Sequence, residues 1–441
     1  TFEELQKIVY DAGIVGAGGA GFPTHRKFSD KVKQIIVNAA ECEPLMMVDH
    51  HILEHHLQAL VDTLNVLIDT MGADEAIIGI KGKNMHLLDT KIVASLEGTK
   101  VRIKEIPDIY PAGDEVVLTY ETTGKIIPEG AIPVMVGVMV INVETVYNIH
   151  CAITNGQPVT QKYVTIGGDV DEDITVKVPV GMKIKALLEA TGHGDLDGKA
   201  VINGGPMMGK HVALDSKITK TTKGLIVLPE DHPLIQDVKL PIPKMLHMAK
   251  AACCHCSMCS EVCPRHLIGH RIEPNKTIRF ASYGSLCDGS DTPMIAFLCS
   301  ECRLCQYACI MNLQPWKVNH ELKGIMAKQG IKSTLHNQPE SVHPMREYKR
   351  FPIKKLIARL GLTKYNVAAP LTELTTEIDH VSIPVGQHIG APAVPCVSVG
   401  DTVAKGDVIA QPAEGKLGAC IHASISGTVK AIADGCISIE K

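Results

Sequence analysis

The chain has 441 residues, of which 45% are hydrophobic and 21% charged, a composition that is ordinary for globular proteins and excludes a fibre or a disordered chain. At roughly 150 residues per domain, the length predicts about three domains. The formal net charge of −4 gives no general attraction to a polyanion, so we expect no nucleic-acid partner.

The N-terminal segment and the apolar stretches bear on the compartment. Residues 2–13, FEELQKIVYDAG, start with acidic residues and carry apolar residues at helical spacing, which predicts a short amphipathic helix and not a signal peptide. The longest apolar stretch, 131–143, is interrupted by Pro133 and Gly137 and is shorter than the ~20 residues that span a bilayer. We therefore expect a cytoplasmic chain without a transmembrane segment.

Hydrophobic patterning divides the chain into five segments. Residues 1–158 alternate helical and strand-like patterns, as in QIIVNA at 34–39, and predict a Rossmann-like α/β domain. Residues 159–240 predict a small α+β domain of short strands and turns, and 241–330 hold cysteine clusters on short helices and loops. Residues 331–378 are polar and contain prolines, which predicts a linker, with the basic stretch 346–359 as its exposed face. Residues 379–441 predict a compact all-β module.

The glycine-rich segment GAGGAGFPTHRK at 16–27 formally contains GxGxxG, but a predicted helix precedes it and Pro23 follows, unlike a Rossmann dinucleotide site. Its glycines would still let backbone N–H groups close on a phosphate, with Lys27 supplying charge, and a plain turn is the alternative. The segments NAAECEP at 38–44 and YPAGDE at 110–115 add amides and carboxylates. Such groups suit a flavin or a nicotinamide ribose, and otherwise form a charged surface.

Two histidines on the predicted helix after residue 47, His51 and His55, lie one helical turn apart, a spacing that could bind a metal. The sequence shows no third ligand nearby, so we interpret this face as solvated.

Fifteen cysteines in a long cytosolic chain favour metal or redox chemistry over disulfides. The runs CCHCSMCSEVCP at 253–264 and CSECRLCQYAC at 299–309 share the x2, x2, x3 spacing of bacterial ferredoxins with two 4Fe-4S clusters. In such ferredoxins the fourth cysteine of each run ligates the other cluster, so the spacing predicts two quartets. The first quartet is Cys253, Cys256, Cys259 and Cys309, and the second is Cys263, Cys299, Cys302 and Cys305.

Paired CxxC motifs also occur in zinc ribbons, so a pair of zinc sites is the alternative interpretation. Cys254 lies beside a predicted ligand but out of register, and we interpret it as structural. The remaining cysteines are scattered and are expected to be buried small hydrophobic residues: Cys42, Cys151, Cys287, Cys396, Cys420 and Cys436.

The glycine-rich and acidic segments, with INVETVYNI at 141–149 and GGPMMGK at 204–210, resemble the flavin and NADH site of two related flavoproteins: the NADH-binding flavoprotein of complex I and the RnfC protein of the Rnf complex. The resemblance implies a multidomain α/β protein: a Rossmann-like FMN/NADH domain, an SLBB β-grasp domain, a dicluster ferredoxin-like helical module and a C-terminal barrel-sandwich (lipoyl-like) β domain. It also implies a cofactor site. FMN phosphate would lie on Gly16, Gly18 and Lys27, the ribityl chain and ring near Asn38, Asp114 and Asn142, and NADH near Phe22, Glu43 and Glu115, with Gly19, Glu41 and Thr145 completing the set.

The order of the domains narrows the resemblance. In RnfC the barrel precedes the glycine loop, whereas here it comes last, which is similar to the PduS-type cobalamin reductases of bacterial microcompartments. Lys416 lies in GKLG without the usual flanking pattern, so we expect no lipoyl or biotinyl arm on the barrel.

The resemblance implies electron transfer from NADH through FMN and two 4Fe-4S clusters to cob(III)alamin or cob(II)alamin, in the cytoplasm or inside a microcompartment. Its partners would be NADH and a corrinoid or protein acceptor, with corrinoid adenosyltransferase, shell proteins and a second copy of the chain as further candidates. Two alternatives stay open: an electron relay within a larger redox complex with a non-corrinoid acceptor, as in Rnf, and an assembly or binding module.

Overall fold

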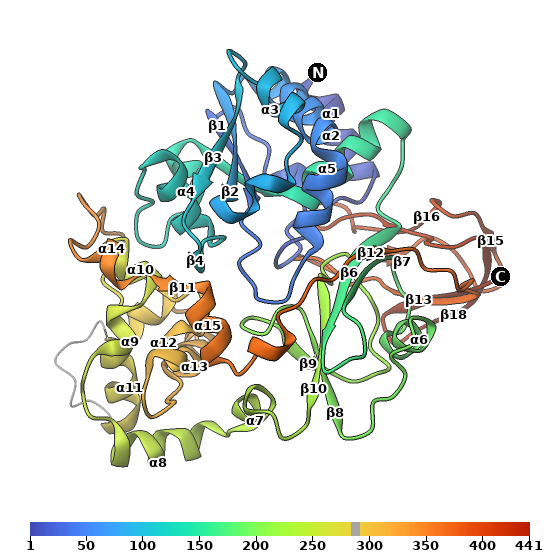
Figure 1. Cartoon of the computed structure of the whole chain (residues 1–441). Helices are drawn as coiled ribbons and strands as arrows, with labels where there is room; N and C mark the ends of the chain where they lie inside the picture. The colour runs from blue at the N-terminus through green and yellow to red at the C-terminus, as the bar shows by residue number, and fades with distance from the viewer. Residues whose placement is uncertain (284–291) are drawn as a thin grey trace.

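The structure, a computed structural model, describes residues 1–283 and 292–441. An α/β domain at the N-terminus, a second sheet domain, a helical module with the cysteine runs and a C-terminal β module follow one another along the chain (Figure 1). Within the described ranges no helix combines the length and the hydropathy needed to cross a membrane.

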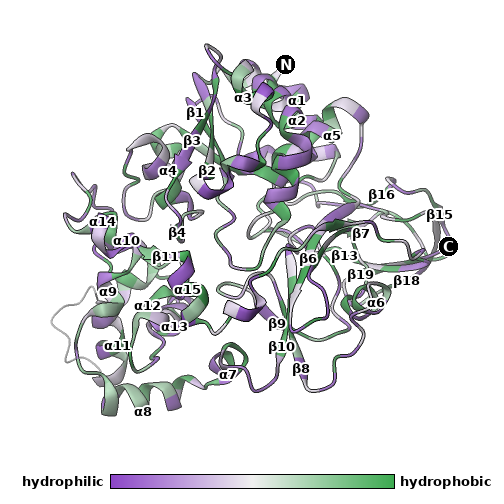
Figure 2. Cartoon of the chain, in the orientation of Figure 1, coloured by the Kyte–Doolittle hydropathy of each residue, from purple (hydrophilic) through white to green (hydrophobic). Residues whose placement is uncertain are grey.

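The N-terminal domain is built on a parallel sheet of strand order β3-β2-β1-β5. Strands β1 and β2 are nearly continuous buried runs, as expected when helices cover both faces of a parallel sheet. In Figure 2 hydrophilic and hydrophobic bands alternate along α2, whose apolar side belongs to the core of this domain. The strands are β1 (Gln34–Ala39), β2 (Glu75–Lys81), β3 (Val101–Ile106), β4 (Ile109–Tyr110) and β5 (Val138–Asn142); the helices are α1 (Phe2–Asp11), η1 (Thr24–Arg26), α2 (Val48–Met71), η2 (Gly82–Leu87), α3 (Thr90–Ser95), α4 (Glu115–Thr123), η3 (Pro133–Val136) and α5 (Val143–Asn155).

The second domain is a mixed sheet of order β12-β7-β6-β10-β8-β9, with α6 packed on its apolar face. The predicted boundary at 158–159 falls in the connection between α5 and β6. The elements are β6 (Gln161–Gly168), β7 (Ile174–Pro179), α6 (Ile184–Ala190), β8 (Lys199–Asn203), β9 (Lys210–Val212), β10 (Gly224–Pro229) and, from later in the chain, β12 (Leu371–Thr372).

The cysteine runs lie in a module of short helices, at the lower left of Figure 1. Each helix leaves its first N–H groups and its last C=O groups without partners inside the helix. A module of short helices therefore has many backbone polar groups next to the loops that carry the cysteines. The helices are α7 (Pro233–Lys239), α8 (Ile242–Ala252), α9 (Met258–Glu261), α10 (Pro264–Leu267), α11 (Pro274–Tyr283), η4 (Thr292–Leu298), α12 (Leu304–Ala308) and α13 (Pro315–Lys328).

The segment 331–378, predicted as a linker, holds more structure than that prediction implied. It contains α14 (Arg346–Lys349), β11 (Phe351–Pro352), α15 (Ile353–Arg359) and η5 (Thr363–Tyr365) before β12. Strand β11 pairs with β4, and Ile353 and Leu356 are buried in an apolar core that also contains Met207 of the second domain and Leu304 of the cysteine module. The basic stretch 346–359 is therefore not simply an exposed face, because its apolar residues hold the domains together.

The C-terminal module consists of two small sheets, β13-β19-β18-β15 and β14-β16-β17, around one apolar core. It contacts the glycine loop of the N-terminal domain, where Ile389 N donates to Gly21 O at 3.1 Å. Lys220 of the second domain bridges the two, because its Nζ donates to the carbonyls of Gly13 at 2.6 Å and Cys420 at 2.7 Å. The strands are β13 (His380–Pro384), β14 (Val394–Pro395), β15 (Thr402–Val403), β16 (Val408–Gln411), β17 (Ile421–His422), β18 (Gly427–Ala433) and β19 (Cys436–Glu440).

Candidate functional site

The N-terminal sheet has a topological switch point beside β1. From β1 the chain goes to β2 and β3 on one side, and then returns to β5 on the other side. In open parallel sheets, ligands bind where the chain reverses direction in this way, at the carboxyl ends of the strands. Here those ends carry Asn38 on β1 and Asn142 on β5, two of the predicted cofactor-binding residues.

The glycine loop lies against the start of α5, at this same edge. Ala17 N donates to Thr145 Oγ1 at 3.0 Å, and a Cβ atom built on Gly18 would lie 2.8 Å from Asn142 Nδ2. Gly18 and Gly19 are exposed, and a Cβ on Gly19 would meet no protein atom within 4 Å in the described structure. The loop therefore approaches the N-terminus of α5 closely and leaves open space on its outer side.

Two side chains close the edge of this space. Lys27 Nζ lies 3.0 Å from Glu115 Oε1 and 3.1 Å from the carbonyl of Val140 on β5. Asn38 donates from Nδ2 to the carbonyl of Gly113 at 2.9 Å, which ties the end of β1 to the YPAGDE segment. Segments that are far apart in the sequence thus meet at one place.

The arrangement fits FMN. A phosphate group suits the combination of a helix N-terminus, an open glycine loop and a lysine, because all three provide positive electrostatic potential or N–H donors. Asn142 is the N-cap of α5 and accepts from Glu144 N at 2.9 Å, so the first turn of that helix is fixed in place. The predicted residues that these contacts bring to this edge of the sheet are Gly16, Gly18, Gly19, Lys27, Asn38, Glu115, Asn142 and Thr145.

We expect Gly19→Ala to weaken FMN binding without weakening the fold. The new methyl group meets no protein atom, so folding should be unaffected, but it would occupy the space assigned to the ligand. Overpacking costs roughly 1–3 kcal/mol, which corresponds to roughly 5- to 150-fold weaker binding. FMN fluorescence titration of reconstituted protein measures this effect, and thermal unfolding measures stability.

A matched control is Gly324→Ala in α13, where a Cβ would also meet nothing within 4 Å. That variant should keep normal FMN affinity. Equal FMN affinity in Gly19→Ala and the wild-type protein would show that the loop does not contact the flavin.

Glu41, predicted to bind the cofactor, is engaged in a buried ionic cluster that the sequence did not indicate. Lys223 Nζ, from the second domain, lies 2.8 Å from Glu41 Oε1 and 2.6 Å from Asp49 Oδ2. Asp49 N also donates to Glu41, and Asn142 Nδ2 lies 3.3 Å from both Asp49 carboxylate oxygens. Burial, followed by repulsion from Glu41, raises the pKa of Asp49. We refer to Glu41, Asp49 and Lys223 as the ionic cluster; through Asp49 it holds the amide of Asn142.

Glu43, predicted to face NADH, has both carboxylate oxygens bound to the GGPMMGK loop of the second domain. It accepts from Met207 N at 2.9 Å and Met208 N at 3.0 Å, and Gly205 lies so close that a Cβ there would be 2.3 Å from Glu43 Oε2. Burial raises the pKa of Glu43 to about 7, although the hydrogen bonds from the backbone N–H groups of Met207 and Met208 oppose that shift. Its contact with NADH stays a prediction. Two other residues were assigned there: Phe22 is half-buried at the end of the glycine loop, and Glu115 pairs with Lys27.

Asp114 joins the predicted flavin site to the cysteine module. One carboxylate oxygen caps α4 by accepting from Val116 N at 3.0 Å, and the other accepts from Arg265 Nη2 at 2.8 Å. Arg265 follows directly after Cys263 and Pro264. Nearby, Tyr110 Oη donates to the carbonyl of Cys302 at 2.9 Å. The second cysteine quartet therefore lies against the segment that also contacts Asn38.

Cysteines assigned to one quartet lie near one another in the structure, while their roles as ligands stay predictions. Besides burial, the neighbours that raise the pKa of Cys259, to about 12, are Cys309, Cys253 and Cys256. Burial and the nearby Cys299 likewise raise the pKa of Cys263 to about 12. The pKa of Cys305 is raised by burial and then by the charges of Cys299, Cys302, Cys259 and Cys263.

The two CxxCxxC loops have the same backbone shape. The middle cysteine of each loop is flanked by residues with positive φ: His255 (56°) and Ser257 (60°) around Cys256, and Glu301 (59°) and Arg303 (65°) around Cys302. Non-glycine residues adopt this conformation rarely, and they do so where the surrounding structure requires it. The two loops therefore have equivalent conformations, as expected if each loop holds one cluster.

The spacing of the thiols bears on the zinc alternative. Four thiolates at ~2.3 Å around a tetrahedral zinc would lie about 3.8 Å from one another. Within the described residues, however, no three of these thiols approach one another within 4.8 Å. Because a cluster of four irons and four sulfides is larger than a single ion, wider spacing suits it. Burial raises the pKa of Cys263 and Cys302, so their thiolate form requires a nearby cation such as cluster iron.

The other cysteines are only partly as expected. Cys420 is buried, Cys42, Cys151 and Cys436 are half-buried, and Cys396 is exposed, contrary to the prediction. Cys254 is exposed, and Cys287 lies outside the described residues.

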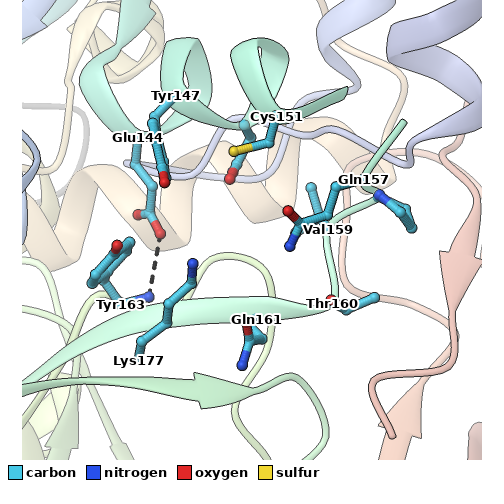
Figure 3. Close-up of a pocket in the computed structure, with 11 residues that line it drawn as sticks. Glu144, Tyr147, Cys151, Gln157, Val159, Thr160, Gln161, Tyr163 and Lys177 are labelled. Atoms are coloured by element: carbon cyan, nitrogen blue, oxygen red, sulfur yellow. Dashed lines mark hydrogen bonds between the residues drawn. The ribbon is translucent and has the colours of Figure 1, made fainter. Parts of the chain in front are cut away.

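A pocket between α5 and the β6–β7 hairpin is distinct from the flavin site (Figure 3). Its lining includes Glu144, Tyr147 and Cys151 of α5 on one side and Lys177 of β7 on the other, and none of the predicted cofactor-binding residues. Lys177 Nζ lies 5.9 Å from the ring centre of Tyr147, and Glu144 pairs with the buried Lys162. These contacts join the first two domains.

Three family models match separate parts of the chain. The Nuo51 FMN-binding domain matches residues 9–151, the 4Fe-4S dicluster domain matches 252–314, and the RnfC barrel sandwich hybrid domain matches 364–440. The predicted multidomain fold, FMN and 4Fe-4S clusters are thereby confirmed. The β-grasp assignment of the second domain and the individual ligand residues stay predictions.

Comparison with individual proteins extends over the whole chain. Cobalamin reductase PduS of Salmonella typhimurium is 39% identical over 444 residues, which covers 100% of this chain and 97% of that protein. A component of the Na(+)-translocating ferredoxin:NAD(+) oxidoreductase complex of Acetobacterium woodii is 31% identical over 271 residues, 60% of this chain and 58% of that protein. An NAD+-reducing NiFe-hydrogenase in its H2-reduced state is 20% identical with a TM-score of 0.47, over 77% of this chain and 64% of that one.

Proposed function

The chain belongs to the family of the cobalamin reductase PduS, as its sequence resemblance predicted, and on that premise we propose that it carries electrons from NADH through FMN and two 4Fe-4S clusters to a corrinoid. It is an oxidoreductase of that type. The main observation behind this proposal is a shared segment. Residues 110–115 are hydrogen-bonded to Asn38 at the predicted flavin site, and also to Cys302 of the second quartet and to Arg265 beside it.

When bound, FMN would supply the conversion between two-electron hydride transfer and single electrons, and each cluster would supply a one-electron carrier. The residues of this chain hold and orient those groups. Lys27 and the amides of the glycine loop would hold the FMN phosphate, and Asn38 and Asn142 would fix the position of the flavin between β1 and β5. Thr145 keeps the loop on α5 through its bond to Ala17 N.

We assign an order to the two clusters. The quartet Cys263, Cys299, Cys302 and Cys305 is proximal to the flavin, because Tyr110 bonds to Cys302 and Asp114 to Arg265. The quartet Cys253, Cys256, Cys259 and Cys309 is distal, and its Cys256 is exposed. Electrons would therefore leave the protein near Cys256, where the side chains of Met258 and Ile310 are also exposed.

The corrinoid product would serve an adenosyltransferase, and a bacterial microcompartment is the proposed location. The relative in Acetobacterium woodii and the RnfC barrel match favour one alternative, an electron relay within a larger complex. In that case the acceptor would be a protein and not a corrinoid.

The test is an anaerobic NADH titration of protein with full flavin, iron and sulfide content. We expect NADH to bleach the flavin and, when hydroxocobalamin is added, the absorbance of cob(II)alamin to appear with repeated turnover. Bleaching with dye reduction but no corrinoid turnover would favour the relay function. No bleaching by NADH would refute the proposed electron donor.

A further inference from the structure

Helix α2 carries four histidines in the sequence HHILEHH at 50–56, and two of them, His50 and His56, are engaged by neighbouring side chains. His50 Nε2 accepts from Asn84 Nδ2 at 2.7 Å, and its other ring nitrogen lies 3.0 Å from Met47 Sδ. The ring of His56 stacks on Tyr147 with 4.1 Å between centroids. These two histidines are parts of the packing, which leaves His51 and His55.

His51 and His55 come together with a third ligand that the sequence spacing did not reveal. One ring nitrogen of each histidine and a carboxylate oxygen of Glu54 all lie within 4.8 Å of one another. The two rings are nearly parallel, with 6.2 Å between centroids, and His55 Nε2 lies 3.9 Å from Glu54 Oε2. The side chains of Glu54 and His55 are about half exposed, at 49% and 47%, so an ion can reach them from solvent.

A hydrogen bond to a backbone carbonyl fixes the ring of His51 and its tautomer. Its Nε2 lies 2.8 Å from the carbonyl oxygen of Ala369, which can only accept, so Nε2 carries the proton and Nδ1 has the lone pair. That Nδ1 is shielded from solvent and has no hydrogen-bond partner in the described structure. Metal-ligating histidines typically donate their other ring N–H to a backbone carbonyl or carboxylate in this way, which fixes the ring and its tautomer.

We propose that His51, Glu54 and His55 form a divalent-cation site of zinc type on the surface of α2, separate from both cysteine quartets. Two imidazoles and one carboxylate are a ligand set that zinc uses when one position stays open to water. Because Ala369 belongs to the segment between α15 and the barrel, an ion on His51 would fix the contact between α2 and that segment. Thr175 Oγ1 donates to the same carbonyl at 3.2 Å, which joins the second domain to this contact.

The test uses full-length protein with both clusters and flavin loaded, washed with EDTA and titrated with zinc chloride against a chromogenic competitor. We expect the wild-type protein to bind one zinc per chain with unchanged iron and sulfide content, and to unfold at a higher temperature when zinc is present. The exposed-ligand variants His55→Ala and Glu54→Gln should each bind zinc at least about tenfold more weakly.

The matched control is His86→Ala, an exposed histidine of the same domain whose Nδ1 lies 2.8 Å from its own chain at Lys83 O. It should keep wild-type zinc affinity. Zinc affinity that is equal in His55→Ala and the wild-type protein would overturn the proposal, as would zinc uptake that releases iron, because the cysteines would then be the ligands.

Discussion

Replacing Cys302 with serine is expected to lower the iron content from about eight to about four atoms per chain and to reduce corrinoid reduction to the background rate. Cys302 is buried near Cys263 and Cys299, and its carbonyl accepts a hydrogen bond from Tyr110 Oη. We therefore place it in the cluster next to the flavin. Without that cluster the distal cluster has no electron donor. Bleaching of the flavin by NADH should persist, because the glycine loop, Lys27 and Asn38 are untouched.

Cys254→Ser is the matched control for this experiment. Cys254 is a neighbour of a ligand in the sequence but is exposed and out of register. The variant should retain all of the iron and the full rate. Iron analysis, flavin bleaching and corrinoid reduction on both variants distinguish a broken electron path from a general loss of folding, since only a misfolded protein would also lose the flavin. A Cys302→Ser protein with eight irons and normal turnover would remove Cys302 from the ligand set.

Local spacing made the cysteine module predictable from the sequence. A CxxCxxC loop brings its cysteines to one cluster whatever surrounds it, and the exchange of the fourth cysteine follows from the two-fold repeat. The glycine loop is a signal of the same local kind, and its role as a ligand site stays a prediction; a Cβ on Gly18 would touch Asn142, whereas one on Gly19 would meet no protein atom. Both signals depend on residues close together in the sequence.

Contacts between domains were not predictable in this way. Glu41 and Glu43 were assigned to the cofactor from the NAAECEP segment and its family resemblance. The structure shows a further set of contacts, with Lys223, Met207 and Met208 of the second domain, more than 160 positions away. The sequence offered one signal for these contacts, which was Lys223. This lysine directly precedes the apolar strand GLIVLP, and a lysine is rarely buried unless an acidic group pairs with it.

The segment 331–378 was misjudged for a related physical reason. Its prolines and charged residues indicate a linker. Its few apolar residues, such as Ile353 and Leu356, are nevertheless buried, because residues from the other domains form the same core. Composition alone cannot show that such a core exists. The same holds for Arg265, whose guanidinium is buried because Asp114 of the first domain pairs with it.

Lys223→Met is expected to destabilise the protein by roughly 3–5 kcal/mol at pH 8, because it leaves the carboxylates of Glu41 and Asp49 buried without a cation. The Glu41 and Asp49 side chains are only 1% and 2% exposed, so water cannot compensate for the loss. Asn142 donates to Asp49, so we also expect weaker FMN binding. The control is Lys199→Met: this lysine lies 3.5 Å from the partly exposed Asp169, and its ion pair should contribute less than about 1 kcal/mol.

The pH dependence separates this ionic effect from a packing effect. The folded-state pKa of Asp49 is already raised by burial and by Glu41, and removal of Lys223 would raise it further. A carboxyl group with a raised folded pKa binds more protons in the folded state, so folding becomes more favourable as the pH falls toward its unfolded value of about 4. The difference in unfolding free energy between wild type and Lys223→Met should therefore shrink between pH 8 and pH 5. Denaturant unfolding at both pH values measures it, and a difference that stays constant would mean that Lys223 acts through packing alone.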